Sequence, residues 1–112
     1  MNSLNFNNMK KRYLAVTLAD ENETKLLIGT PTKRVMDELI ALKSALESFE
    51  EDNTNTDAID DLYSACAKIM NRNKAGVKIT KEFIENLFDI EDVIIFFDAY
   101  MNFVGELSES KN

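Results

Sequence analysis

The stretch from Ile90 to Leu107, IEDVIIFFDAYMNFVGEL, constrains the fold most, because it is too apolar for a helix that contacts a core on one side only. At helical spacing, apolar side chains cover about half of its surface, and Ile95 is misplaced among the polar side chains. The polar stripe consists of Glu91, Asp92, Asp98, Asn102 and Glu106. Such a helix predicts a helical core and favours a further contact with another protein.

The composition is that of a globular protein with one domain. The chain has 112 residues, enough for a single hydrophobic core, and is 45% hydrophobic and 29% charged, which argues against wholesale disorder. The formal net charge of −7 argues against non-specific binding to nucleic acid or to anionic membranes. We therefore expect no nucleic acid and no membrane among the partners.

Several residue types needed for common chemistry are missing. The chain has no His and a single Cys, so the usual zinc sites and the Ser-His and Cys-His nucleophile pairs are unavailable. Its three glycines, at positions 29, 76 and 105, lie too far apart for a phosphate-binding loop. We expect no cofactor and no metal, and predict that the protein is not an enzyme.

One acidic connector has the alternate spacing of calcium ligands. Asn53, Asn55 and Asp57 are spaced like the oxygen ligands of an EF-hand, but Ala58 stands where that loop needs Gly and Ser64 where it needs Glu. The connector is therefore interpreted as a polar loop, with Asp57 as the cap of the next helix.

The amino-terminal residues suggest an intracellular protein. MNSLNFNNMKKRYL lacks the order of a secretory signal, and one Cys fits a reducing compartment. The last apolar stretch is interrupted by Asp98 and Asn102, which argues against a membrane span. We expect a soluble cytoplasmic protein.

The hydrophobic pattern predicts an α+β fold that is mostly helical. Residues 1–12 are interpreted as a flexible tail, and period-two alternation predicts a β-hairpin over 13–28 with its loop at 19–23. Helical spacing predicts about four helices in a small bundle, over about 31–49, 58–71, 81–88 and 90–105. Residues 13–107 form one domain, and 108–112 are a polar tail.

Capping residues set the expected helix ends. Thr30 is expected to cap the first helix with Pro31 at its first position, while Thr80 and Asp89 are expected to cap the third and fourth helices. Gly105 is the expected terminator of the last helix. Cys66 lies within the apolar stripe of the second helix and is interpreted as a core residue.

The apolar surplus of the last helix gives a candidate binding surface. Most of its apolar side chains can be assigned to the core, and the surplus reduces to Ile94, Ile95 and Met101. We predict that these residues contribute to a surface for a partner or for self-association.

Three segments carry a resemblance to a known family. TPTKRVMDEL (30–39), NKAGVKIT (73–80) and LFDIEDVIIFFDAYM (87–101) resemble the tail assembly chaperones of long-tailed bacteriophages that infect Gram-positive bacteria. The resemblance covers roughly 13–107 and is one of pattern and length. It implies a small, mostly helical protein of the host cytoplasm, absent from the mature virion, which binds the tape measure protein and keeps it soluble while the tail tube assembles. It also implies self-association and, in many members, a longer frameshifted form that recruits the tail tube protein.

Two other functions stay open at this point. One is a structural virion component, such as a head–tail connector, which would be found in purified particles. The other is an acidic regulatory protein that imitates DNA, which would bind a basic nucleic-acid-binding protein in a salt-sensitive way.

Overall fold

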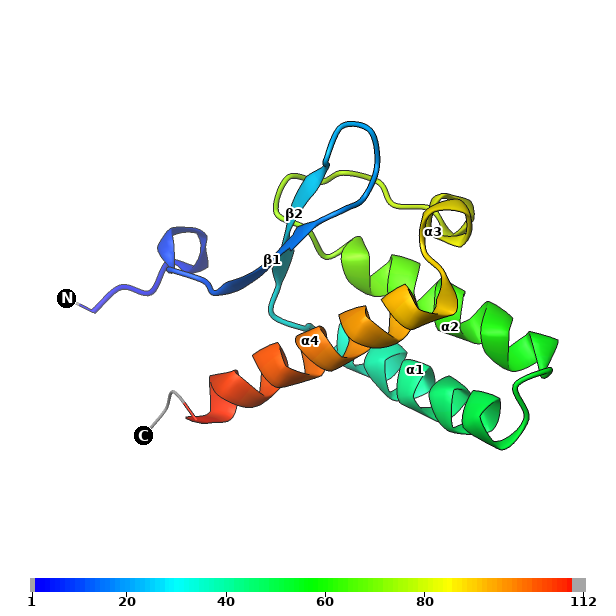
Figure 1. The fold of residues 1–112 in the computed structure, drawn as a ribbon. Coiled ribbons are helices and arrows are strands. Elements are labelled where there is room, and N and C mark those ends of the chain that lie inside the picture. Colours follow the sequence, from blue (N-terminus) through cyan, green and yellow to red (C-terminus); the bar gives the residue numbers. More distant parts are fainter. Residues whose placement is uncertain (1, 110–112) are drawn as a thin grey trace.

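The computed structural model describes residues 2–109 and has the predicted α+β, mostly helical fold. In Figure 1, α1 and α2 run antiparallel, α4 crosses them, and the hairpin lies above the helices. The elements are a 3₁₀ turn Phe6–Asn8, strands β1 Tyr13–Thr17 and β2 Lys25–Gly29, and helices α1 Lys33–Glu51, α2 Thr56–Met70, α3 Lys81–Leu87 and α4 Ile90–Glu109. Of the polar tail expected over 108–112, residues 110–112 lie outside the described part.

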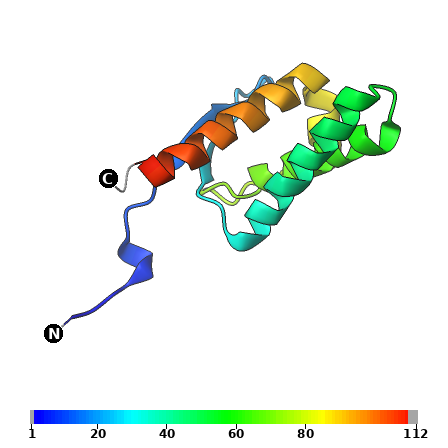
Figure 2. The same ribbon diagram turned by 90° about the horizontal axis from the view of Figure 1, so that it is seen from below.

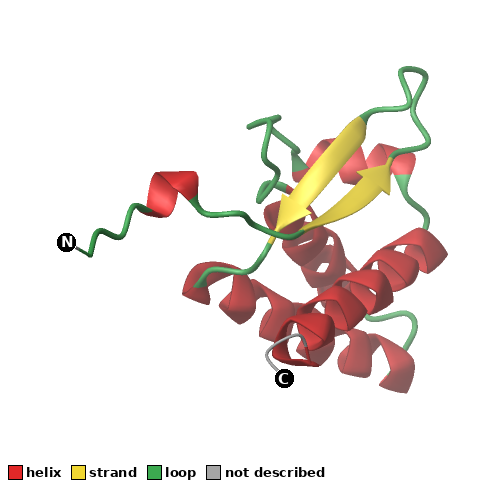
Figure 3. Ribbon diagram, turned by 90° about the vertical axis from the view of Figure 1, so that its left-hand side faces the viewer, coloured by secondary structure: helices red, strands yellow, loops and turns green. Residues whose placement is uncertain are grey.

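The hairpin forms where the period-two pattern predicts it. β1 and β2 pair antiparallel, with Ala15 opposite Leu27. One face of the hairpin packs into the core through the side chains of Leu14, Val16, Leu18, Leu26 and Ile28. Figure 3 shows both strands lying over the helices, which supply the support that an isolated two-stranded sheet lacks.

The outer edge of β2 is also paired. The amide of Gly29 donates to the carbonyl of Arg72 at 2.7 Å, and the amide of Lys74 donates to the carbonyl of Leu27 at 2.9 Å. Asn73 forms an isolated bridge with Ile28 between these bonds. The segment after α2 therefore protects this edge like a short third strand, whereas β1 pairs with β2 alone among the described residues.

Two predicted helix starts are wrong by a few residues. α1 begins at Lys33, because Thr32 and not Thr30 accepts a hydrogen bond from the amide of Val35. α2 begins at Thr56, because the side chain of Asn55 caps it by accepting from the amide of Ala58. Asp57 lies in the first turn of α2, where its charge favours the helix N-terminus without capping it.

Two other predicted caps are confirmed. Thr80 accepts from the amide of Phe83 at the start of α3. Asp89 and Asp92 exchange hydrogen bonds at the start of α4, with each side chain accepting from the other residue's amide. Gly105 does not end α4, which continues to Glu109, because one exposed glycine costs only about 1 kcal/mol in a helix.

The core joins the hairpin to all four helices. Apolar side chains of α1 and α2 meet in it, and α4 adds a row of large side chains. Its largest fully buried members include Tyr100, Leu42, Leu62, Met70 and Ile84. Figure 2 shows that the segment before β1 extends away from this core, although Arg12 contacts α4 through an ion pair with Glu106 at 3.4 Å.

Two asparagine side chains hold the connection between α2 and α3. The Asn71 amide group donates to the carbonyls of Ala67 and Ile79, and its oxygen accepts from the Ile79 amide. Asn73, only 8% exposed, donates to the carbonyls of Met70 and Val77 and accepts from the Val77 amide. The path of this loop, and hence the protection of β2, depends on these bonds.

Candidate functional site

The free edge of β1 is the first component of the candidate site. In an antiparallel pair the backbone hydrogen bonds alternate, and the bond from the Leu18 amide to the Thr24 carbonyl fixes that alternation. The N–H and C=O groups of Tyr13, Ala15 and Thr17 therefore point away from β2. Within residues 2–109, no other segment forms a backbone hydrogen bond with them. β1 thus presents an unpaired strand edge to solvent.

An apolar groove lies beside this edge. It has a volume of about 270 Å³ and is formed by β1, the start of the hairpin loop and one side of α4. Its lining residues are Leu14, Ala15, Val16, Thr17, Ala19, Phe88, Asp92, Ile95, Phe96 and Ala99. Ile95 is 57% exposed, so it adds a large exposed apolar side chain to the lining of the groove.

The three residues predicted for a partner surface do not form one patch. Ile95 lies in the groove beside β1. Ile94 and Met101 are seven residues apart and share another side of α4, because seven residues are close to two helical turns. Ile94 is half-buried, whereas Met101 is 39% exposed. α4 therefore has two separate apolar flanks.

Charges of opposite sign lie at the two ends of β1. Lys10, Lys11 and Arg12 precede the strand, and the hairpin loop carries Asp20 and two glutamates at positions 21 and 23. The hydroxyl and amide of Thr24 donate to the Asp20 carboxylate, and the hydroxyl is the main cause that lowers the pKa of Asp20 below its usual value. The loop is thus a fixed acidic turn, while β1 itself carries no charged side chain.

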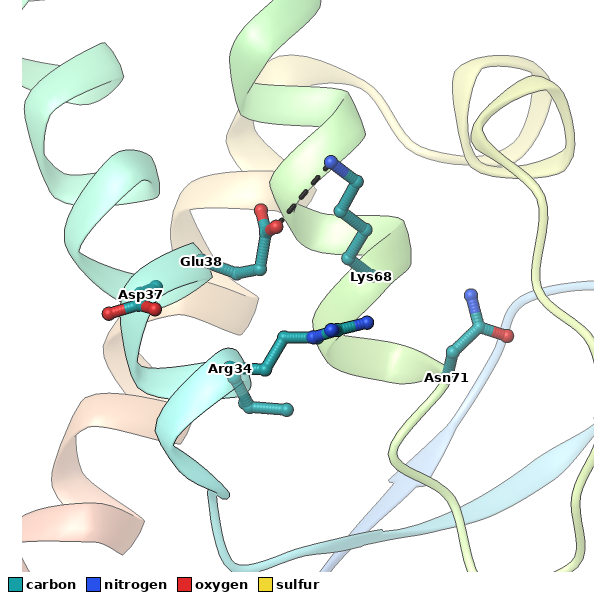
Figure 4. Close-up of a pocket in the computed structure, with 6 residues that line it drawn as sticks. Arg34, Asp37, Glu38, Lys68 and Asn71 are labelled. Atoms are coloured by element: carbon teal, nitrogen blue, oxygen red, sulfur yellow. Dashed lines mark ion pairs between the residues drawn. The ribbon is translucent and has the colours of Figure 1, made fainter.

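A larger hollow lies elsewhere, between α1 and α2 (Figure 4). It has a volume of about 490 Å³ and is lined by Arg34, Val35, Asp37, Glu38, Lys68 and Asn71. Glu38 and Lys68 form an ion pair across it at 3.4 Å, and Asp37 pairs with Lys33 at 3.1 Å. The Asn71 amide is also engaged with backbone carbonyls, so the carboxylates and the amide that line this surface depression already have partners.

Several of the described carboxylates serve in caps, turns and ion pairs. Asp52 accepts from the amide and hydroxyl of Thr54, and Asp60 pairs with Lys81 at 3.4 Å. Among residues 2–109, no group of three or more His, Cys, Asp or Glu side chains has an arrangement that could hold a metal ion. None of the helices in this part of the chain is long and apolar enough to cross a bilayer.

Cys66 is a core residue, as its position in the sequence pattern indicates. Its side chain is fully buried, and this desolvation raises the pKa of the thiol from 9.0 to about 12. Because only the thiolate is strongly nucleophilic, the folded protein keeps Cys66 unreactive.

We expect Cys66 to react with a thiol reagent such as dithiobisnitrobenzoate only when the protein unfolds. At pH 8, the raised pKa alone lowers the thiolate fraction about a thousandfold relative to an unfolded chain, and burial blocks access further. Absorbance of the released thiolate gives the rate with and without urea. Labelling of the native protein at the rate of the urea-unfolded protein would contradict the buried position.

Sequence reasoning found Ile95 but not the groove. The groove combines β1 with residues 88–99, and periodicity within one element does not show which distant elements meet. Two signals were present: an isoleucine within a polar stripe, and a strand without charged side chains to protect its edge.

The comparisons with known proteins add no assignment to this geometry. No family model matches the chain, and neither a curated protein nor a solved structure shows significant similarity to it.

Proposed function

We propose that this protein is a non-catalytic tail assembly chaperone of a long-tailed bacteriophage. It binds the tape measure protein and keeps it soluble in the host cytoplasm during tail tube assembly, and it is absent from the mature virion. A longer frameshifted form, where one is made, would contact the tail tube protein. The proposal rests on the resemblance of three segments, 30–39, 73–80 and 87–101, and on the apolar surface of α4.

The exposed apolar side chains of α4 are the observation that carries the proposal. A long helical client with apolar seams needs a partner that covers those seams, and a helix-in-groove contact does this. On the flank of Ile94 and Met101, an apolar side chain that is 39% exposed lies next to a half-buried one. The unbranched Met101 side chain adapts to varied client side chains, which suits a chaperone.

The roles of the polar groups support a function without catalysis. The carboxylates of Asp20, Asp52, Asp89 and Asp92 accept hydrogen bonds from nearby backbone amides. The only described thiol, that of Cys66, is buried with a raised pKa. These groups are occupied in holding the fold.

We expect co-expression with the tape measure protein encoded in the same genome to keep that protein soluble, and the two to co-purify. Met101→Glu should lower the recovery of soluble tape measure protein several-fold, because it places a charge in the apolar contact. Val77→Glu is the matched control, since Val77 is also 39% exposed but lies in the loop before α3. Circular dichroism verifies that both variants fold.

Three results would count against the proposal. A tape measure protein that stays insoluble and does not co-purify would exclude the chaperone role. The presence of this protein in purified particles would instead favour a structural virion component. Binding to a basic nucleic-acid-binding protein that is lost at high salt would favour an acidic DNA mimic.

A further inference from the structure

We propose that the free edge of β1 pairs with β1 of a second copy of this chain, antiparallel and centred on Ala15. The two hairpins would then form one continuous four-stranded sheet, and each copy would cover the Ile95 groove of the other. The strand edge, the register and the charges support this interface, which does not depend on the proposed function.

The strand edge provides the backbone groups. Tyr13, Ala15 and Thr17 direct their N–H and C=O groups away from β2, and no other described segment pairs with them. Soluble proteins usually protect an edge strand with charges, proline or a covering segment. β1, with the sequence YLAVT, has no charged residue and no proline, whereas the edge of β2 is covered by 72–74. The hairpin therefore has one covered edge, on β2, and one uncovered edge, on β1.

The register follows from which residues point their backbone N–H and C=O groups away from β2. Such residues can pair only with residues of the same kind in the second copy, and the overlap of 13–17 with its copy is greatest when Ala15 lies opposite Ala15. Tyr13 then lies opposite Thr17 of the second copy, and each pair exchanges two backbone hydrogen bonds. This arrangement has two-fold symmetry, as a closed dimer requires.

The charges at the ends of β1 select the second copy as the partner. In this register, Lys10 of one copy lies beside Asp20 of the other, and the same contact recurs at the opposite end of the paired strands. Lys10 and Lys11 thus meet the acidic turn of the other copy at both ends of the paired strands, whereas Arg12 pairs with Glu106 of its own chain. A parallel pairing would place equal charges side by side, which is unfavourable. The sequence around β1 is complementary to itself only in the antiparallel direction.

The groove supplies apolar contact area beneath the paired strands. Residues opposite each other in an antiparallel pair project to the same side of the sheet, so Leu14 and Val16 of the second copy project toward the helices. There they lie over the groove that contains Ile95, Phe96 and Ala99. Burial of Ile95, which is 57% exposed in the single chain, accounts for an apolar residue within the polar stripe of α4.

Sedimentation equilibrium tests the proposal on the full chain. We expect a dimer that dissociates on dilution, and Ala15→Pro should raise its dissociation constant at least about tenfold, because proline removes one donor from each copy. The Ala15 amide does not bond to β2, so the hairpin can keep its own ladder. A protein that is monomeric at concentrations on the order of 100 μM would overturn the proposal, as would a dimer that Ala15→Pro does not weaken.

A charge exchange tests the antiparallel register without changing the strand. Lys10→Glu with Lys11→Glu should weaken the dimer several-fold at low salt, and adding Glu21→Lys and Glu23→Lys in the same chain should restore it. The dimer is expected to be restored only if residues 10–11 of one copy lie against the hairpin loop of the other. If the fourfold variant dimerises no better than the double variant, the register is wrong.

Ile95→Asp tests the groove, with Ile40→Asp as the matched control. Ile40 is 62% exposed on α1, so both changes place a carboxylate at a similarly exposed helical isoleucine. We expect only Ile95→Asp to weaken the dimer, by about tenfold or more, with helical circular dichroism unchanged. Equal dimerisation of the two variants would exclude the groove from the interface.

Discussion

Replacing Tyr100 with Ala is expected to lower the free energy of unfolding by about 3–5 kcal/mol. Tyr100 is fully buried and is among the largest fully buried side chains of the protein. Its ring lies 6.1 Å from that of Phe96 and 5.8 Å from that of Phe103, between centroids. The substitution therefore removes aromatic contacts and leaves a cavity where α4 packs on the core.

Tyr100 also holds α4 to the hairpin. Its hydroxyl donates to the carbonyl of Gly29, the last residue of β2, at 3.0 Å. Burial raises the pKa of Tyr100 to about 12, so the hydroxyl keeps its proton throughout the pH range in which the protein is handled. One side chain thus supplies core volume and a polar link between two elements far apart in sequence.

A smaller substitution distinguishes the contribution of the ring from that of the hydroxyl. Tyr100→Phe keeps the ring, and we expect it to cost about 1–2 kcal/mol, because it leaves the buried Gly29 carbonyl without its donor. Urea unfolding followed by circular dichroism, at one fixed protein concentration, measures both variants. A loss below about 1 kcal/mol for Tyr100→Ala would contradict the central position of this residue.

The elements were predictable because each has a period of its own. Alternation over 13–28 and helical spacing over the rest of the domain reflect local geometry, which a single sequence carries. Helix starts were harder where several capping residues lie together, as in Thr30-Pro31-Thr32 and in Asn53 to Asp57. A tertiary contact holds Thr30 beside the loop after α2, where its carbonyl accepts from Arg72 at 3.0 Å, and Thr32 caps α1.

The candidate site was predictable only in its parts. Ile95 stood out because helical spacing places it among polar residues, and its exposure agrees with that pattern. The sequence did not indicate that Ile94 and Met101 lie on another flank than β1, because no local pattern specifies which side of α4 the hairpin covers. The groove depends on packing between distant segments, and so does the proposal that one flank binds a client and the other a second copy.

The role of the loop asparagines also depends on contacts that a local sequence pattern does not show. Asn73→Ala should lower the free energy of unfolding by about 2–4 kcal/mol. Asn73 looks like an ordinary loop residue in the sequence, yet its side chain satisfies the carbonyls of Met70 and Val77 and the amide of Val77. Alanine leaves these groups without their partner in a part-buried loop. The loop then loses the path that holds it against the outer edge of β2.

Asn53→Ala is the matched control, because Asn53 is exposed in the turn between α1 and α2. The side-chain hydrogen bonds of the described residues in this turn come from its neighbours and not from Asn53. We expect this variant to change the unfolding free energy by less than about 0.5 kcal/mol. Hydrogen exchange adds a local measurement: in Asn73→Ala the amides of Gly29 and Lys74 should exchange faster than those of α1, because their bonds join β2 to this loop. Equal stability of the two variants, with unchanged exchange at Gly29 and Lys74, would mean that the backbone alone fixes the loop. The expected difference would show that the side chain of Asn73 keeps the loop on the edge of β2. With that edge covered, β1 is the unprotected edge of the hairpin.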